Sequence, residues 1–164
     1  MVIPPFECGV LAGGLRLGAL ASNGMIMTYA YLLTPFLAWL VAGILKFIIN
    51  SIKAKQWAFG LIGYGGLPSN HSAIVSSMAS LIALKEGFNH PAFGVALSQA
   101  FIVILDASSL RRQIGKQAQA LNRLAAASNV QLSLRERVGH TPLEITAGIV
   151  VGYLSAASVY LLGA

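Results

Sequence analysis

The 164-residue chain is 56% hydrophobic and only 10% charged, with a mean hydropathy of +0.73. Soluble domains carry about 25% charged residues, so this composition excludes a water-soluble globular domain. Eleven basic residues against five acidic ones suit anionic lipid head groups or a phosphorylated substrate. The basic residues are not interleaved with aromatic ones, so we expect no nucleic-acid binding. The length predicts one domain, residues 1–164.

The N-terminal segment begins MVIPPFECG and lacks a basic n-region and a compact apolar h-region, so we expect no cleaved signal peptide. Residues 9–28 are apolar and glycine-rich but contain Arg16. We predict that residues 1–28 are a loose or re-entrant segment. The single cysteine, Cys8, excludes an internal disulfide framework.

Two long apolar segments, 29–49 and 145–164, have about the 20 residues that a bilayer-crossing helix needs. Two shorter ones, 72–84 and 92–105, lie between them and contain many small residues, which allow close helix packing. We therefore predict an all-α, polytopic membrane bundle of about four to five membrane helices, with its core in residues 29–164.

With four crossings, the long polar segments 50–71 and 107–142 lie on the same side of the membrane. Within the second, apolar residues recur at three- and four-residue steps and basic residues recur on another face. This pattern predicts an amphipathic helix that continues the third span along the membrane interface. The two segments hold eight of the eleven basic residues, so the positive-inside rule predicts that they are cytoplasmic. A phosphate site, however, would need basic residues whichever side of the membrane it faced.

The segment 65–72 reads GGLPSNHS and carries the first candidate site. Its glycines and Pro68 predict a tight turn, and Ser69 is a natural N-cap for the next helix. Free N–H groups at that helix start can bind an anion, with His71 beside them. Taken alone, the segment is more often a capped helix with a surface histidine.

The segment 135–144 carries the second candidate site. Thr141 and Glu144 match a capping box, which explains Glu144 without catalysis. The functional interpretation is that Glu144 orients His140 for nucleophilic attack.

Together, two histidines at helix starts on one membrane face, flanked by basic residues, predict a phosphoryl-transfer site. One imidazole would attack phosphorus, the other would protonate the leaving oxygen, and Lys and Arg would neutralise the phosphate. No aspartate cluster indicates a two-metal site, and two histidines are too few for zinc, so we expect no metal or other cofactor. We interpret Asp106 as the partner of a neighbouring Lys or Arg, and His90 as a turn residue.

In order and spacing, these segments resemble the type 2 phosphatidic-acid phosphatase superfamily, which includes the vanadium-dependent haloperoxidases. GGLPSNHSA, DASSLRRQIGKQAQALN and GHTPLE resemble its divergent membrane branch most closely. The first superfamily motif is Lys, six residues, Arg-Pro: Lys46 matches, Lys53 stands at the Arg position, and no proline follows. In the second, Pro-Ser-Gly-His, Asn70 replaces the glycine. The third motif is Arg, five residues, His, three residues, Asp. Here Glu144 replaces the Asp, and Leu134 occupies the Arg position.

The resemblance implies a phosphatidic-acid-phosphatase-like fold in which His140 is the nucleophile, Glu144 orients it, and His71 is the general acid. The phosphate ligands that it implies are Lys46, Lys53, Ser69 and the Asn70 backbone. The charge that the motif's missing arginine would carry is expected from Arg111, Arg112 or Arg135.

The leading hypothesis is a metal-independent membrane phosphatase that hydrolyses a lipid phosphate or polyprenyl pyrophosphate through a phosphohistidine. The alternative, favoured by Leu134, is a catalytically weak or inactive protein that binds phospholipid head groups in the same pocket. A vanadate-dependent haloperoxidase ranks last, because the known ones are soluble. Partners are the lipid substrate and membrane lipids, and homo-oligomerisation stays open.

Overall fold

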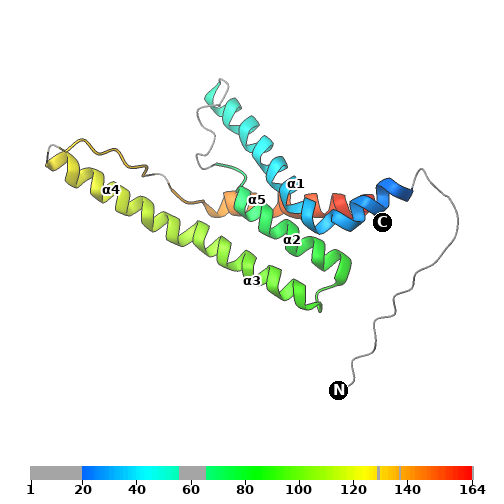
Figure 1. Cartoon of the computed structure of the whole chain (residues 1–164). Coiled ribbons are helices and arrows are strands. Elements are labelled where there is room, and N and C mark those ends of the chain that lie inside the picture. Colours follow the sequence, from blue (N-terminus) through cyan, green and yellow to red (C-terminus); the bar gives the residue numbers. More distant parts are fainter. Residues whose placement is uncertain (1–19, 56–65, 129, 137, 164) are drawn as a thin grey trace, which may run out of the picture.

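The computed structural model describes residues 20–55, 66–128, 130–136 and 138–163, with side chains from residue 29 onward. This part of the chain is helical and forms no strand. Its elements in chain order are α1 (Leu20–Ala54), α2 (Asn70–Glu86), α3 (Pro91–Leu105), the π-helical turn η2 (Asp106–Leu110), α4 (Arg111–Ala127) and α5 (Pro142–Gly163), as Figure 1 shows. Residues 20–28 of the predicted N-terminal segment are the first turns of α1, and residues 1–19 lie outside the described residues.

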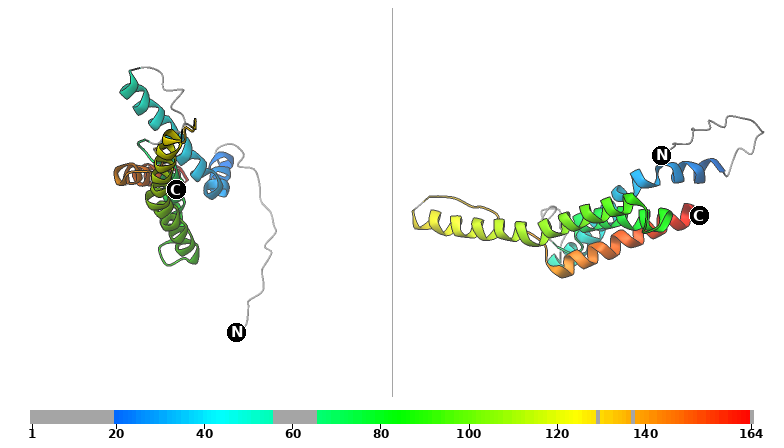
Figure 2. Two further views of the ribbon diagram at one scale, coloured as in Figure 1. Left: turned by 90° about the vertical axis from the view of Figure 1, so that its left-hand side faces the viewer. Right: turned by 90° about the horizontal axis from the view of Figure 1, so that it is seen from below.

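The bundle is built around α2, which packs against α1, α3 and α5 (Figures 1 and 2). Its interfaces consist mainly of small side chains. Ala73 packs with Ala38 and Ala42 of α1, and Leu81 packs with Ala30 of α1 and Ala156 of α5. Small residues let helix backbones approach closely, which is the usual packing of membrane helices.

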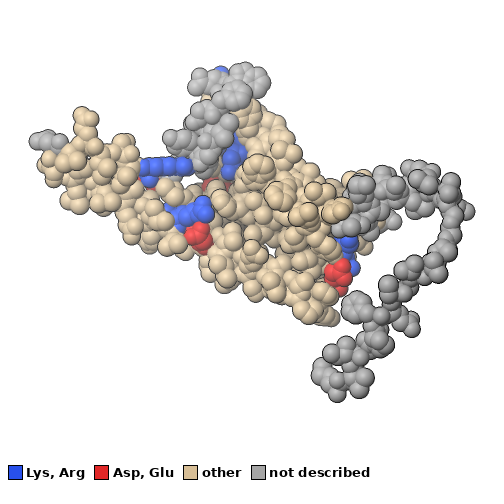
Figure 3. Space-filling view, viewed as in Figure 1, with Lys and Arg blue, Asp and Glu red and all other residues tan. Residues whose placement is uncertain are grey.

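The outer surface of the bundle is apolar. On α1, for example, Leu33, Phe36 and Trp39 are each more than half exposed. Among the described residues, three helical stretches are long and apolar enough to cross a membrane, namely Tyr29–Ala54, Pro91–Ala127 and Pro142–Gly163. The shorter, serine-rich α2 lies between them. Figure 3 shows charged side chains where α4 leaves the bundle and near the opposite end, with an uncharged band between. The prediction of an all-α membrane bundle is confirmed.

The helices α3, η2 and α4 form one continuous rod (Figures 1 and 2). No proline follows Pro91 within it, and the wide turn is closed by the Arg111 N–H, which donates to the Asp106 carbonyl. The predicted amphipathic continuation of the third span is therefore present as α4. This uninterrupted helix keeps the direction of α3, and the predicted course of α4 along the membrane interface stays a prediction.

After α4 the chain returns toward the bundle in an extended stretch, residues 130–136 and 138–140, here called the return segment (Figure 2). The Asn122 amide of α4 holds it, donating to the Leu134 carbonyl and accepting from the Leu134 N–H, both at 2.8 Å. Its backbone then passes directly over Gly115. At its end the His140 N–H donates to the Ala107 carbonyl of η2 at 3.0 Å. The return segment thus delivers the chain to the start of α5.

Candidate active site

The two histidines singled out in the sequence meet at one end of the bundle. His71 is the second residue of α2, and His140 lies two residues before α5. Their ring centroids are 6.1 Å apart and the ring planes are tilted by 54°. His140 is only 8% exposed, whereas His71 is open to the surface. The two imidazoles are close enough for both to contact a single phosphate group.

Backbone contacts hold the two helix starts together. The Ser69 N–H donates to the Glu144 carbonyl at 2.8 Å, and the His140 N–H donates to the Ala107 carbonyl. Gly139, directly before His140, has a φ of +99°, a backbone conformation that residues other than glycine rarely adopt. A Cβ there would also lie only 3.3 Å from the Ala107 oxygen. The glycine before His140 is therefore required by the turn that aims the imidazole.

One carboxylate oxygen of Glu144 both caps α5 and contacts the imidazole of His140. Oε2 accepts from the Thr141 N–H at 3.0 Å and lies 3.1 Å from His140 Nδ1. The Glu144 N–H in turn donates to Thr141 Oγ1 at 3.3 Å, so the predicted capping box is confirmed. An ionised carboxylate only accepts hydrogen bonds, so the proton is assigned to Nδ1 and the lone pair to Nε2. The structural and functional interpretations of Glu144 are thus compatible.

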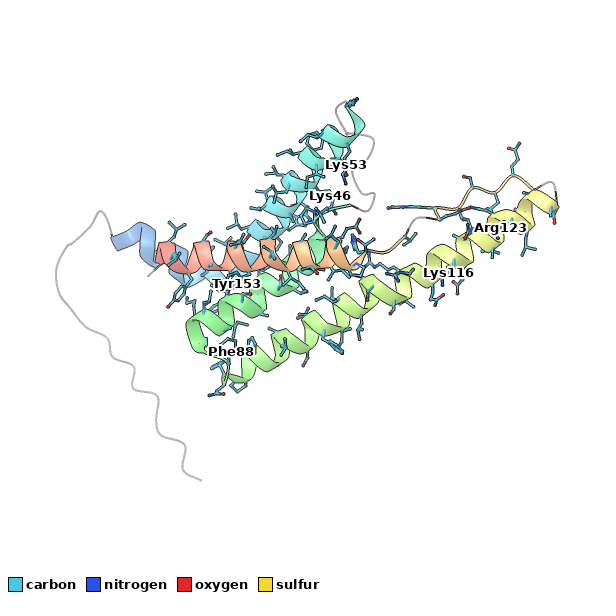
Figure 4. All side chains as sticks on the ribbon, turned by 180° about the vertical axis from the view of Figure 1, so that it is seen from behind. Lys46, Lys53, Phe88, Lys116, Arg123 and Tyr153 are labelled. Atoms are coloured by element: carbon cyan, nitrogen blue, oxygen red, sulfur yellow. The ribbon has the colours of Figure 1, made fainter. Side chains whose placement is uncertain are left out.

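Two cations lie beside this pair. Lys46, half-buried on α1, is near enough to interact electrostatically with Glu144 and His71. Figure 4 shows it on the stretch of α1 next to the bundle. Arg111 also acts electrostatically on His71, and its Nε donates to Asp106 Oδ2 at 2.8 Å. The prediction that Asp106 pairs with a neighbouring basic residue is confirmed, and the pair fixes one edge of the Arg111 guanidinium.

The pKa of His71, which precedes the apolar stretch of α2, is lowered from its ordinary value of 6.5. Burial is the largest cause, because it disfavours the charged imidazolium. The positive charges of Arg111 and Lys46 and the electrostatic effect of the neighbouring His140 lower it further, while Asp106 opposes them. A phosphate anion placed among these cations would favour a protonated His71.

The remaining predicted phosphate ligands take different places. Ser69 is the N-cap of α2, as predicted, and is fully buried; its Oγ accepts from the Ser72 hydroxyl at 3.0 Å and from the Ser72 N–H. Its hydroxyl is therefore used within the fold. Asn70 points its side chain toward Gly43 of α1, and its buried Oδ1 has no hydrogen-bond partner among the described residues. Lys53 is exposed farther along α1 than Lys46 (Figure 4).

The usual arginine position of the third motif lies far from the imidazoles. Leu134 occupies it and is bound to Asn122, which lies about 22 Å along the helical rod from Ala107 at roughly 1.5 Å per residue. No side chain spans that distance. Arg135 follows Leu134 on the exposed return segment, and Arg112 is exposed on α4. Of the three predicted substitutes, Arg111 is the one whose charge acts on His71.

Sequence reasoning missed the carbonyl of Ala107 and the amide of Asn122, which together position the loop that carries His140. The only signals were the glycine before His140 and a lone asparagine in a helix of Ala, Gln and Leu. Within the described ranges no group of three or more His, Cys, Asp or Glu side chains is arranged to hold a metal ion.

Comparison with known proteins agrees with this architecture. The family model described as "Divergent PAP2 family" matches residues 27–155. The "Uncharacterized membrane protein YuiD" of Bacillus subtilis (strain 168) is 31% identical over 146 residues, covering 79% of this chain and 92% of the relative. No solved structure matches. The family match extends over most of the chain and includes all four bundle helices, both histidines and Glu144, so the chain belongs to the Divergent PAP2 family.

Proposed function

We propose that this membrane protein is a phosphatase that hydrolyses a lipid phosphate or pyrophosphate through a phosphohistidine, without a metal. The observation that carries the proposal is the meeting of His71 and His140 at two adjoining helix starts, with Glu144 on Nδ1 of His140. A nucleophile, an orienting carboxylate and a second titratable group within reach of one reacting atom are the parts that covalent phosphoryl transfer needs.

In the first step, Nε2 of His140 attacks phosphorus, forming an N–P bond as the bond from phosphorus to the lipid oxygen breaks. The His71 imidazolium gives its proton to that oxygen, so the leaving group departs in protonated form. It is the lipid alcohol or, from a pyrophosphate, the lipid monophosphate. In the second step, neutral His71 takes a proton from a water molecule as the water oxygen attacks phosphorus. The N–P bond breaks, inorganic phosphate leaves, and both imidazoles return to their initial states.

The surrounding charges suit this sequence. Attack places a positive charge on the His140 ring, which the Glu144 carboxylate stabilises across the 3.1 Å contact. Lys46 and Arg111 lie on opposite elements and would neutralise the phosphate oxygens in both steps. Among the described residues Arg111 is tethered to Asp106 through Nε, and its terminal N–H groups would donate to phosphate oxygens.

The position of the site favours a lipid substrate. His71 lies at the start of α2 and His140 just before α5, at the end of the bundle from which α4 continues. Figure 3 shows basic side chains where α4 leaves the bundle, beside the uncharged band. A phosphate attached to an acyl or polyprenyl tail has its head at this level and its tail among the helices. We further propose that this end faces the cytoplasm, since its flanking segments hold most of the basic residues. Reaction of a Gln119→Cys variant with a membrane-impermeant maleimide from outside intact cells would contradict that orientation.

The second candidate function is head-group binding without turnover. It is favoured by Leu134, since the superfamily's guanidinium is missing from its usual position. Both functions use Lys46 and Arg111, so they differ in whether the N–P bond forms.

Purified protein in detergent micelles, assayed for phosphate release from phosphatidic acid and from a polyprenyl pyrophosphate without added metal, separates the two. We expect turnover, inhibition by vanadate, and at least a 10³-fold loss in His140→Ala. The matched control is His90→Asn, because His90 caps α3 at the opposite end of the bundle and asparagine also caps. Equal release from wild type and His140→Ala would refute the nucleophile, and binding without release would establish the second function.

A further inference from the structure

One surface of α4 is apolar and uncovered. Its large side chains are Leu110, at the end of η2, and Ile114, Leu121 and Leu124 of α4, which are exposed by 58, 46, 48 and 65%. At 100° per residue these four project within one narrow sector of the helix. We name them the leucine stripe.

The other two faces of α4 are already accounted for. Gly115, Ala118 and Ala125 are buried on the face along which the return segment runs. The exposed cations Arg112, Lys116 and Arg123 project roughly opposite the leucine stripe, and Figure 4 shows Lys116 and Arg123 along the length of α4. Helix α4 therefore has three faces: one that packs against the return segment, one basic face exposed to solvent, and one apolar face without a partner in the described structure.

The leucine stripe lies beyond the apolar part of the rod. The apolar part of the rod ends at Leu105, and the ion pair of Asp106 and Arg111 marks the polar boundary. Because α4 continues the direction of α3 (Figure 2), its 17 residues carry the stripe up to about 25 Å away from that boundary. An apolar strip of this length in water marks an interaction site.

The spacing of the stripe identifies the kind of partner. Leu110, Ile114, Gln117, Leu121 and Leu124 follow one another at steps of four, three, four and three residues. These are a and d positions of two heptads: Ile114 at a with Leu110 and Leu124 at d is the combination that favours two strands, and Leu121 and Gln117 take the remaining a and d positions. The cations fall at c and f positions, away from the seam, so two identical helices can approach without burying like charges.

We propose that the leucine stripe binds the leucine stripe of a second copy of this chain, forming a parallel two-stranded coiled coil outside the membrane. Two copies inserted in the same orientation are related by a two-fold axis along the membrane normal, and this symmetry makes the protruding helices parallel. Two heptads alone are too short for a stable coiled coil in water. Here the membrane spans hold both copies in one plane and one orientation, which raises their effective concentration.

Cysteine cross-linking in native membranes tests the proposal. In a Cys8→Ser background, Leu121→Cys and Leu124→Cys place one thiol on the stripe, while the controls Gln119→Cys and Arg123→Cys place it on the basic face. All four positions are exposed, so the variants retain the fold. We expect oxidation to yield covalent dimers at least 10-fold faster for the two stripe variants than for the two controls. A doubly substituted Leu121→Glu, Leu124→Glu protein should migrate as a monomer with its thermal unfolding unchanged.

Two results would overturn the proposal. The first is cross-linking at equal rates from both faces, or none from the stripe. The second is quenching of a fluorophore at Leu121→Cys by lipids brominated along their acyl chains, which would mean that the stripe lies in the bilayer. Neither result bears on phosphate release, so the proposed chemistry is tested separately.

Discussion

Replacing Glu144 by glutamine separates its structural role from its chemical one. In the structure one oxygen, Oε2, accepts from both the Thr141 N–H and His140 Nδ1. The carbonyl oxygen of a glutamine can accept the same two hydrogen bonds, so Glu144→Gln keeps the cap and the imidazole orientation. Only the negative charge is lost.

The size of the effect follows from the charge that develops on His140. A carboxylate about 4 Å from a unit positive charge contributes about 4 kcal/mol at an effective dielectric constant of about 20. The imidazolium charge is spread over the ring, so we take about 3 kcal/mol as the loss of transition-state stabilisation. This corresponds to a decrease in kcat of about 10²-fold.

The assay is phosphate release in detergent micelles, measured beside thermal unfolding for three variants. Glu144→Gln should lose about 10²-fold in kcat with little change in Tm. Thr141→Ala removes only the acceptor of the Glu144 N–H, so it should lower stability by about 1 kcal/mol and leave kcat within a few-fold. Glu144→Ala should combine both losses. A glutamine variant as active as wild type would refute the electrostatic role of Glu144.

Three further changes test other parts of the site. Arg111→Lys should lower kcat/KM about 10-fold, because a point charge cannot hold Asp106 and phosphate together. The control Arg123→Lys should leave kcat/KM unchanged, and equal effects of the two changes would contradict the role of Arg111. The lowered pKa of His71 means that its acid form is lost as pH rises, so kcat/KM should decline above mildly acidic pH. A decline that persists in His71→Gln would belong to another group. Gly148→Ala would drive a Cβ into the Ser69 carbonyl, whereas Gly94 has no atom within 4 Å; we expect a loss of about 1–3 kcal/mol for the first and none for Gly94→Ala.

The helices and the convergence of the two histidines could be predicted because each depends on local patterns. Apolar length identified the spans, and the even number of crossings placed segments 50–71 and 107–142 on one side. The Thr141 and Glu144 spacing predicted a cap that the structure confirms. None of these inferences requires knowledge of contacts between distant residues.

The direction of α4 and the location of the missing guanidinium could not be predicted, because both depend on such contacts. Amphipathic spacing is the same for a helix on a membrane surface and for one that pairs with protein. Motif spacing placed Leu134 at the arginine position, yet Asn122 holds that residue far from His140. Arg111, which lies outside the three superfamily motifs, instead has the largest of the electrostatic effects that lower the pKa of His71.

The loop that ends in His140 and the start of α5 are attached to their neighbours by peptide groups. The Ala107 carbonyl receives the His140 N–H, and the Ser69 N–H reaches the Glu144 carbonyl. Every amino acid offers the same carbonyl, so exchange of the side chain at position 107 does not remove the first attachment. Relatives can therefore drift far apart in sequence and still assemble this geometry, provided that glycine stays at position 139, where the backbone turns. In such proteins a search for the intact turn finds the site more dependably than a search for each polar residue of a motif.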